Sequence, residues 1–240
     1  SCLAQVDVET AKCSDTDFTQ VLSCYREKLA AEPLIYNLLS QENLPGLEWR
    51  RYQLTSQNWS PESLVSPAAW QHEVEIFIPE NSTSTKALVV INNGINYGTE
   101  TIPPSGPGDF AIETLQNIAR STDSVVIAIS TIPNQYLEYQ QDGNPRKEDY
   151  SVARSWTLFI DAPEARSTLP LHVPMVAAIS QAMTMAQQAL PEKAIDSFIV
   201  TGLSKRGWTS WLTAIADSRV EAIVPFVIDL LDTRAALEHM

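Results

Sequence analysis

The chain has 240 residues and a net charge of −13 at neutral pH, and this length suits one large domain or two small ones. The excess of acidic side chains argues against nucleic acid as a main ligand and favours a neutral or cationic one. No apolar stretch approaches the roughly 20 residues of a membrane-spanning helix. The chain also starts at Ser1 without a signal-peptide core, so we expect a processed or trimmed chain with no transmembrane segment.

The first part of the chain predicts a helical appendage. Residues 16–39 show a helical pattern that Pro33 interrupts, and a polar break follows at residues 41–46. We therefore divide the chain into an N-terminal helical appendage, residues 1–46, and a core, residues 47–240.

All three cysteines, Cys2, Cys13 and Cys24, lie in this appendage. In an exported protein, Cys13 and Cys24 would close a short disulfide loop, which leaves Cys2 lipid-modified or paired elsewhere. The alternative is three reduced cysteines in a cytosolic protein. The histidines are single and scattered, without the spacing of zinc ligands, so we expect no metal and no cofactor.

The core alternates strands and helices. Residues 47–54 and 70–79 alternate polar and apolar side chains, which is typical of antiparallel strands with one exposed face. The later apolar runs are continuous and predict buried parallel strands joined by helices. The predicted parallel strands are residues 86–91, 124–129, 197–201 and 220–228, and the predicted helices are residues 110–121, 151–160, 174–190 and 208–216.

Ser204 stands between the third of these strands and the last helix, within Thr201-Gly202-Leu203-Ser204-Lys205-Arg206-Gly207. A serine on a tight strand-to-helix turn is typical of a nucleophile elbow, which exposes the hydroxyl to a base. Gly202 has the expected position two residues before the serine. Arg206 occupies the usual position of the second glycine, so the elbow is a variant. The alternative interpretation is that Ser204 only caps the helix.

Three segments around this serine resemble the PhoPQ-activated pathogenicity-related family within the α/β-hydrolase superfamily: residues 173–176, 201–209 and 217–225. The resemblance implies an α/β-hydrolase fold with a mostly parallel sheet and flanking helices. It also implies an exported, periplasmic or secreted, hydrolase-like protein of bacterial virulence, linked to resistance against antimicrobial peptides. Family members would be about double this length.

The elbow predicts a mechanism for the part of the site that is present. Ser204 would attack a carbonyl, and the backbone N–H of Lys205 together with one from the Gly94-Ile95 turn would bind the oxyanion. The side chain of Lys205 or Arg206 would recognise a substrate carboxylate, or else pair with acidic residues of this acidic protein.

The rest of a catalytic triad is not evident in the sequence. In this fold the acid and the histidine follow the nucleophile; Asp229, after the last strand, is the candidate acid, and His239 is better explained as an exposed helical residue. We therefore expect the C-terminal half of the same gene product, or a second processed chain, to complete the site. The predicted function is a serine hydrolase that cleaves an ester or amide in a small molecule or peptide. The alternative is a non-catalytic virulence or signalling factor that binds a peptide or protein partner.

Overall fold

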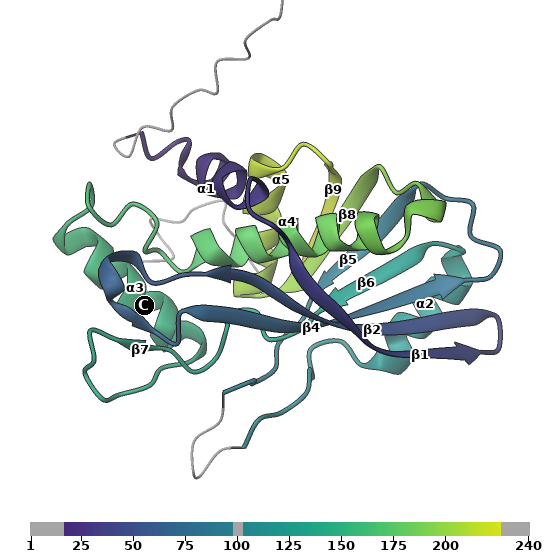
Figure 1. Cartoon of the computed structure of the whole chain (residues 1–240), viewed down its shortest axis with the longest axis horizontal. Helices are drawn as coiled ribbons and strands as arrows, with labels where there is room; N and C mark the ends of the chain where they lie inside the picture. Colours follow the sequence, from purple (N-terminus) through teal and green to yellow (C-terminus); the bar gives the residue numbers. More distant parts are fainter. Residues whose placement is uncertain (1–16, 98–102, 227–240) are drawn as a thin grey trace, which may run out of the picture.

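The computed structural model describes residues 17–97 and 103–226, and a seven-stranded sheet lies at its centre (Figure 1). A separate pair of short strands, β3 (Val65–Ser66) and β7 (Glu138–Tyr139), forms a small second sheet. The strands of the main sheet are β1 (Ile35–Leu44), β2 (Leu47–Asn58), β4 (Ala69–Pro79), β5 (Lys86–Ile91), β6 (Val125–Ile129), β8 (Ser197–Leu203) and β9 (Val220–Phe226).

The order of strands across the main sheet is β1-β2-β4-β6-β5-β8-β9. The pairs β1–β2, β2–β4 and β4–β6 are antiparallel, whereas β6–β5, β5–β8 and β8–β9 are parallel. The parallel strands β5 and β6 are apolar and buried along most of their length, as strands covered on both faces must be. This topology confirms the expected α/β-hydrolase-like fold.

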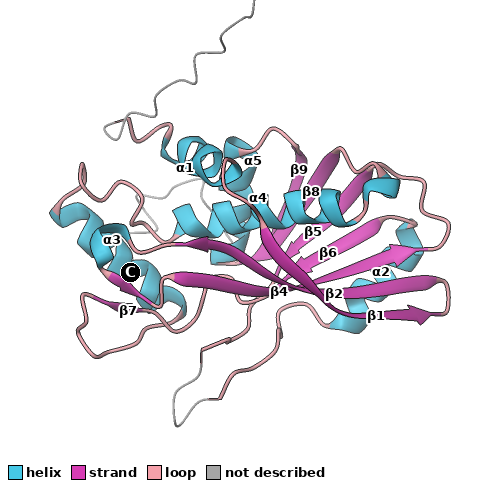
Figure 2. Ribbon diagram, in the orientation of Figure 1, coloured by secondary structure: helices cyan, strands magenta, loops and turns pink. Residues whose placement is uncertain are grey.

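Helices cover both faces of the sheet (Figure 2). One face carries α4, against which α1 and α5 pack, and the other face carries α2, which contacts β4 and β6. The helices are α1 (Val21–Ala30), α2 (Ile112–Thr122), α3 (Glu148–Asp161), α4 (His172–Ala189) and α5 (Lys205–Ala216), with two short 3-10 helices at Pro61–Ser63 and Pro191–Lys193.

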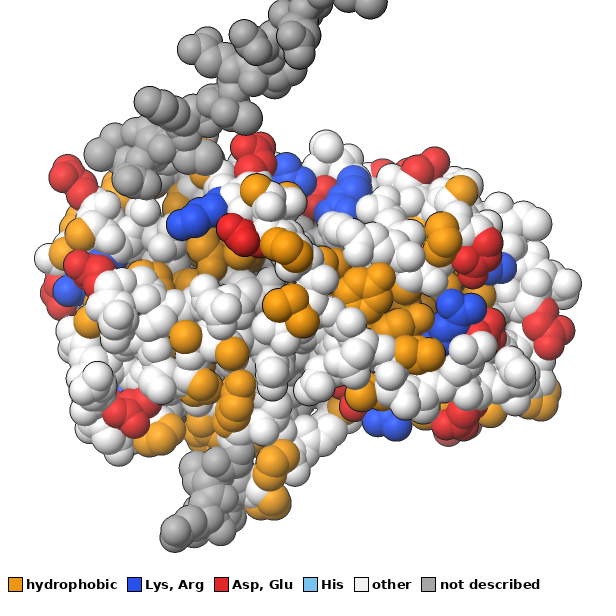
Figure 3. Space-filling model, viewed as in Figure 1, with side chains coloured by type: hydrophobic (Ala, Val, Ile, Leu, Met, Phe, Trp, Pro, Cys, Tyr) orange, Lys and Arg blue, Asp and Glu red, His pale blue; other side chains and the backbone are white. Residues whose placement is uncertain are grey.

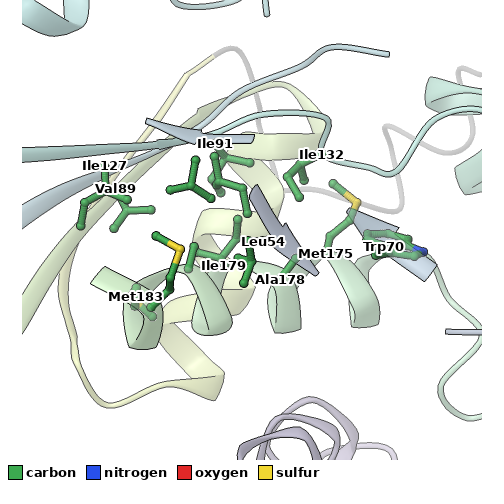
Figure 4. Packing of buried hydrophobic residues seen from close by; sticks show 14 of the residues in the cluster. Leu54, Trp70, Val89, Ile91, Ile127, Ile132, Met175, Ala178, Ile179 and Met183 are labelled. Atoms are coloured by element: carbon green, nitrogen blue, oxygen red, sulfur yellow. The ribbon is translucent and has the colours of Figure 1, made fainter. Parts of the chain in front are cut away.

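The larger hydrophobic core lies between α4 and the sheet (Figure 4). Met175, Ile179 and Met183 of α4 are fully buried, and they pack in one cluster with Val89 of β5 and Ile127 of β6. Each such side chain contributes about 1.5–3 kcal/mol through the apolar area it removes from water. This packing fixes the central parallel strands, and with them the end of β8 where Ser204 lies.

Residues 35–44 differ from the prediction. The sequence pattern indicated a helix as far as residue 39 and a polar break at 41–46, but the helix α1 ends at Ala30 and β1 follows. Pro33 explains where the helix ends, since proline disfavours helical geometry in the residue before it. Pairing with β2 then satisfies the β1 backbone, although Ile35 and Leu38 stay 64% and 49% exposed. The division of the chain at residues 46 and 47 stays a prediction, but the sheet itself includes β1.

The face that carries α1 and α4 mixes hydrophobic and charged side chains at its surface (Figure 3). Within the described ranges, no helix has the length and apolar character that crossing a bilayer demands.

Candidate active site

Ser204 has a backbone conformation that few residues adopt. Its φ is 52° and its ψ is −122°, at the junction of β8 and α5. Such a conformation costs about 1–3 kcal/mol in a residue other than glycine, and the surrounding structure must hold it in place. Two hydrogen bonds do so: the Ser204 N–H donates to the Phe226 carbonyl at 2.9 Å, and the Ser204 carbonyl accepts from the Trp208 N–H at 3.0 Å. Ser204 is also exposed, as a nucleophile elbow requires, and its role as a nucleophile stays a prediction.

Gly202 allows the strand and the helix to meet at this angle. A Cβ atom at residue 202 would lie 2.7 Å from the Arg206 carbonyl oxygen and 2.9 Å from the Arg206 Cβ. Real Cβ atoms do not approach other atoms so closely, so only glycine fits here. The position of Arg206, where a second glycine is usual, does not disturb the turn because its side chain leaves toward other elements.

The backbone N–H of Lys205 is available for the predicted oxyanion site. It belongs to the first turn of α5, whose N–H groups have no partner within the helix. No carbonyl in the described part of the chain accepts a hydrogen bond from it. Its role in binding an oxyanion stays a prediction.

The second predicted donor needs a correction. The N–H of Ile95 donates to the Ser105 carbonyl at 2.8 Å, and Ile95 accepts a bond from Ser105 in return. That N–H is therefore not free to bind an oxyanion. Gly94 remains the predicted donor of this turn. It has a φ of 133°, and a Cβ there would lie 3.1 Å from Thr131 Cγ2, so the turn requires glycine.

The side chains of Lys205 and Arg206 are held by acidic residues. Lys205 Nζ pairs with Glu148, and it lies 3.1 Å from Asp149 Oδ1. Arg206 is only 5% exposed; its Nε donates to Asp109 Oδ2 at 2.8 Å and its Nη1 lies 3.3 Å from Glu148 Oε1. These contacts match the alternative in which both cations pair with acids. A role of Arg206 in binding substrate stays a prediction without support from this geometry.

Glu148 stands at the start of α3 and is the centre of this network. Burial alone would raise the pKa of its carboxyl, but Arg206 and Lys205 together hold that pKa below its ordinary value. The carboxylate is therefore charged at neutral pH. It ties the segment between β6 and α4 to the elbow, a link that the sequence did not indicate.

A second link joins the elbow to the turn after β5. Asp109, which binds Arg206, donates its backbone N–H to Asn93 Oδ1 at 3.0 Å, and Gly108 donates to the same oxygen at 2.6 Å. Asn93 directly precedes Gly94. The guanidinium of Arg206 thus connects the turn at Ser204 to the turn that carries the second predicted oxyanion donor.

The described histidines, His72 and His172, are buried and form no hydrogen bond with Ser204. His72 Nε2 lies 3.0 Å from Ser56 Oγ, and its Nδ1 lies 3.1 Å from the Ser130 carbonyl oxygen. His172 packs against Trp208 with ring centroids 4.2 Å apart, and neither of its nitrogens has a hydrogen-bond partner. Burial lowers the pKa of each to about 4. The candidate acid Asp229, and His239, lie outside the described residues.

Cys24 is disulfide-bonded. Cys13 and Cys2 lie outside the described residues, so the predicted pairing of Cys13 with Cys24 stays a prediction. Residues 17–97 and 103–226 contain no group of three or more His, Cys, Asp or Glu side chains placed to hold a metal ion.

The chain matches one protein family and shares sequence with a known protein. A profile of the PhoPQ-activated pathogenicity-related proteins matches residues 22–240. Autocrine proliferation repressor protein A of Dictyostelium discoideum is 32% identical over 192 residues, which cover 78% of this chain but only 37% of that protein. The chain therefore spans little more than a third of the length of this relative.

Two solved structures share the fold. Acetyl xylan esterase 1 from a Thermoanaerobacterium species superposes with a TM-score of 0.57 at 13% identity, covering 93% of this chain and 62% of that one. The acetyl xylan esterase of a Paenibacillus species gives a TM-score of 0.54 at 16% identity, over 93% of this chain and 63% of that one. At such low identity these likenesses show the α/β-hydrolase fold alone.

Proposed function

The chain belongs to the PhoPQ-activated pathogenicity-related protein family, and from this premise we propose that it is a serine hydrolase that cleaves an ester, or an amide, through Ser204. The observation that carries this proposal is the exposed Ser204 side chain on a strained turn at φ 52° and ψ −122°. A helix-capping serine needs no such strain, because caps adopt ordinary extended backbone. The Ser204 side chain also makes no capping hydrogen bond.

The proposed reaction uses groups on either side of the turn. Ser204 Oγ attacks the carbonyl carbon and transfers its proton to a histidine base, and the carbonyl oxygen becomes an oxyanion. The N–H groups of Lys205 and Gly94 stabilise this oxyanion, and such a donor is worth about 2.7–4 kcal/mol in the transition state. The histidine returns the proton to the leaving alcohol or amine, and water then releases the acyl group from Ser204 by the same route.

The base and acid are proposed to come from a further part of the gene product, or from a second processed chain, with Asp229 as the candidate acid. Two observations support a further polypeptide at this edge of the sheet. The last described strand, β9, leaves Val224 and Phe226 exposed by 47% and 44%, and α5 leaves Trp211 and Ile215 exposed by 48% and 71%. Natural proteins cover such apolar sheet edges.

Export is part of the same proposal. The disulfide of Cys24 fits an oxidising compartment such as the periplasm or the extracellular space. The link to virulence and to antimicrobial-peptide resistance comes from the family resemblance. The substrate is proposed to be a small molecule or peptide.

The test is labelling of the full-length gene product with a fluorophosphonate probe, together with cleavage of p-nitrophenyl acetate. We expect Ser204→Ala to abolish both while leaving the melting temperature nearly unchanged. The matched control is Ser121→Ala, which removes an exposed hydroxyl from α2 and should retain full activity. Equal labelling of the wild type and Ser204→Ala would rule out Ser204 as the nucleophile.

The second candidate is a non-catalytic α/β-hydrolase-like factor that binds a peptide or protein partner. The observation in its favour is the relative named as an autocrine proliferation repressor, because that name describes a signal and no reaction. An unlabelled wild type, with a full-length chain that still folds, would favour this candidate over the hydrolase.

A further inference from the structure

A groove of about 670 Å³ lies on the sheet face that carries α2. Its floor is formed by alternate residues of β2 and β4, because side chains two residues apart share a face of a strand. The turn at residues 95–97, residues 104–107 and Ile112 of α2 also line the groove. Ser204 is not among the lining residues, although Ile95, which follows Gly94 in the turn after β5, is one of them.

Three charged side chains lie on this floor. Arg51 donates from both Nε and Nη2 to Glu73 Oε1, at 2.9 and 2.8 Å. The charges of Arg51 and Glu73 therefore cancel each other. The third is Glu75, which is opposite Arg51 in the register of β2 and β4, yet no ion pair joins Glu75 to a cation within the described residues.

Burial of the Glu75 carboxylate is energetically unfavourable. Glu75 is only 2% exposed, and a buried carboxylate without a paired charge is strongly unfavourable. Burial and the charge of Glu73 raise the pKa of Glu75 to about 7, against smaller opposing effects of Arg51 and the Trp49 indole. The Trp49 indole nitrogen itself is buried without a hydrogen-bond partner of ordinary geometry. Within the described residues, the effects of Arg51 and Trp49 are too small to compensate the burial of this carboxyl, which nevertheless lines the groove.

We propose that this groove binds an alkylammonium group, with the ammonium paired to Glu75 and the alkyl chain against apolar lining residues. Those residues are Trp49, Ile95, Ile112, Pro104 and Pro107.

A cation explains Glu75 better than two other ligands. A neutral polyol would hydrogen-bond to the carboxylate but leave its charge uncompensated. A divalent metal ion needs several oxygen ligands, whereas Glu73 is committed to Arg51 and no metal-binding cluster occurs in the described ranges. The net charge of −13 also attracts cations to the molecule as a whole.

Calorimetric titration of the full-length protein with n-butylammonium chloride, beside the neutral isostere 1-butanol at equal ionic strength, tests this proposal. We expect the ammonium to bind at least tenfold more tightly than the alcohol, and Glu75→Gln to weaken its binding at least tenfold. The matched control is Glu80→Gln, an exposed acid next to the end of β4, which should change the affinity less than twofold.

Two further measurements keep the result interpretable. Glu75→Gln should melt no lower than the wild type at pH 7, because it removes an uncompensated charge. Ser204→Ala should bind the ammonium as the wild type does, so that loss of hydrolysis and loss of amine binding are separate outcomes.

The pH dependence of ammonium affinity provides a second test of the proposal. Around Glu75, Glu73 and Arg51 remain paired and His72 is neutral above about pH 4, while the lining residues from 104–107 and Ile112 carry no charge. With a Glu75 pKa of about 7, ammonium affinity should fall about tenfold between pH 8 and pH 6, since the proton must leave first. No ammonium binding by the wild type, equal binding of butanol, or undiminished binding by Glu75→Gln would overturn the proposal.

Discussion

The replacement Gly202→Ala tests whether the close packing of β8 against α5 maintains the turn at Ser204. The new Cβ would lie 2.7 Å from the carbonyl oxygen and 2.8 Å from the carbonyl carbon of Arg206. These are backbone atoms of the first turn of α5, so no side-chain rotation relieves the contact. The strand cannot move aside either, because Gly202 is paired with Ile91 of β5 and with Pro225 of β9.

Overpacking of this kind costs about 1–3 kcal/mol, which for a domain of this size lowers the melting temperature by about 2–12 °C. Differential scanning calorimetry measures the loss, and cleavage of p-nitrophenyl acetate should fall with it because the elbow must shift. The control is Gly106→Ala, where a Cβ meets nothing within 4 Å and the melting temperature should stay within about 2 °C. A Gly202→Ala protein as stable as Gly106→Ala would refute the reasoning.

Three other predictions concern the same region. Ser204→Gly should be about 1 kcal/mol more stable than Ser204→Ala in denaturant titration, because only glycine accepts a φ of 52° with a ψ of −122° without strain; equal stability would show that the turn is relaxed. Glu148→Gln should lose about 1.5–3 kcal/mol at pH 7. Since the pKa of Glu148 is lowered in the folded state, this contribution is complete above the ordinary pKa near 4.5 and disappears as the pH falls below it; unfolding measured at pH 7 and pH 3 should show the difference shrink, and a constant difference would contradict the ion-pair explanation. Between pH 7 and pH 5 the wild type should lose about 2 kcal/mol of stability through His172, because burial, with help from Lys205, lowers the His172 pKa to about 4 and the unfolded chain takes up the proton first. His172→Phe should lack this part of the loss; an unchanged pH profile would exclude that role.

The sequence predicted the strand-to-helix turn at Ser204 and the central strands because their signals are local. Continuous apolar runs identify β5, β6 and β8, and the spacing of Gly202 and Ser204 identifies the elbow. The strand β1 escaped prediction because the helical pattern of the sequence continues to residue 39, and the pairing with β2 that makes this segment a strand is not visible in the local sequence.

The errors and omissions at the site have a common physical cause. Arg206 contacts Asp109 and Glu148, which are 97 and 58 residues away in the sequence, and nothing local indicates such pairs. The Ile95 prediction failed for a similar reason, because its N–H is used by a bridge to Ser105. The pairing of Ile95 with Ser105 within the loop after β5 determines which backbone N–H group is free. A turn motif in the sequence does not reveal this pairing.

The hydrogen bond from Ser204 to Phe226 has a consequence for how the protein is made. The strained turn persists only while β5, on one side of β8, and β9, on the other, hold the strand in place. During synthesis β5 emerges from the ribosome more than a hundred residues before β8, and β9 emerges last of the three. The hydrogen bond from Ser204 to Phe226 therefore cannot form until both β8 and β9 are made. The backbone geometry of Ser204 is thus completed only when β9 docks beside β8, which is a late step of folding.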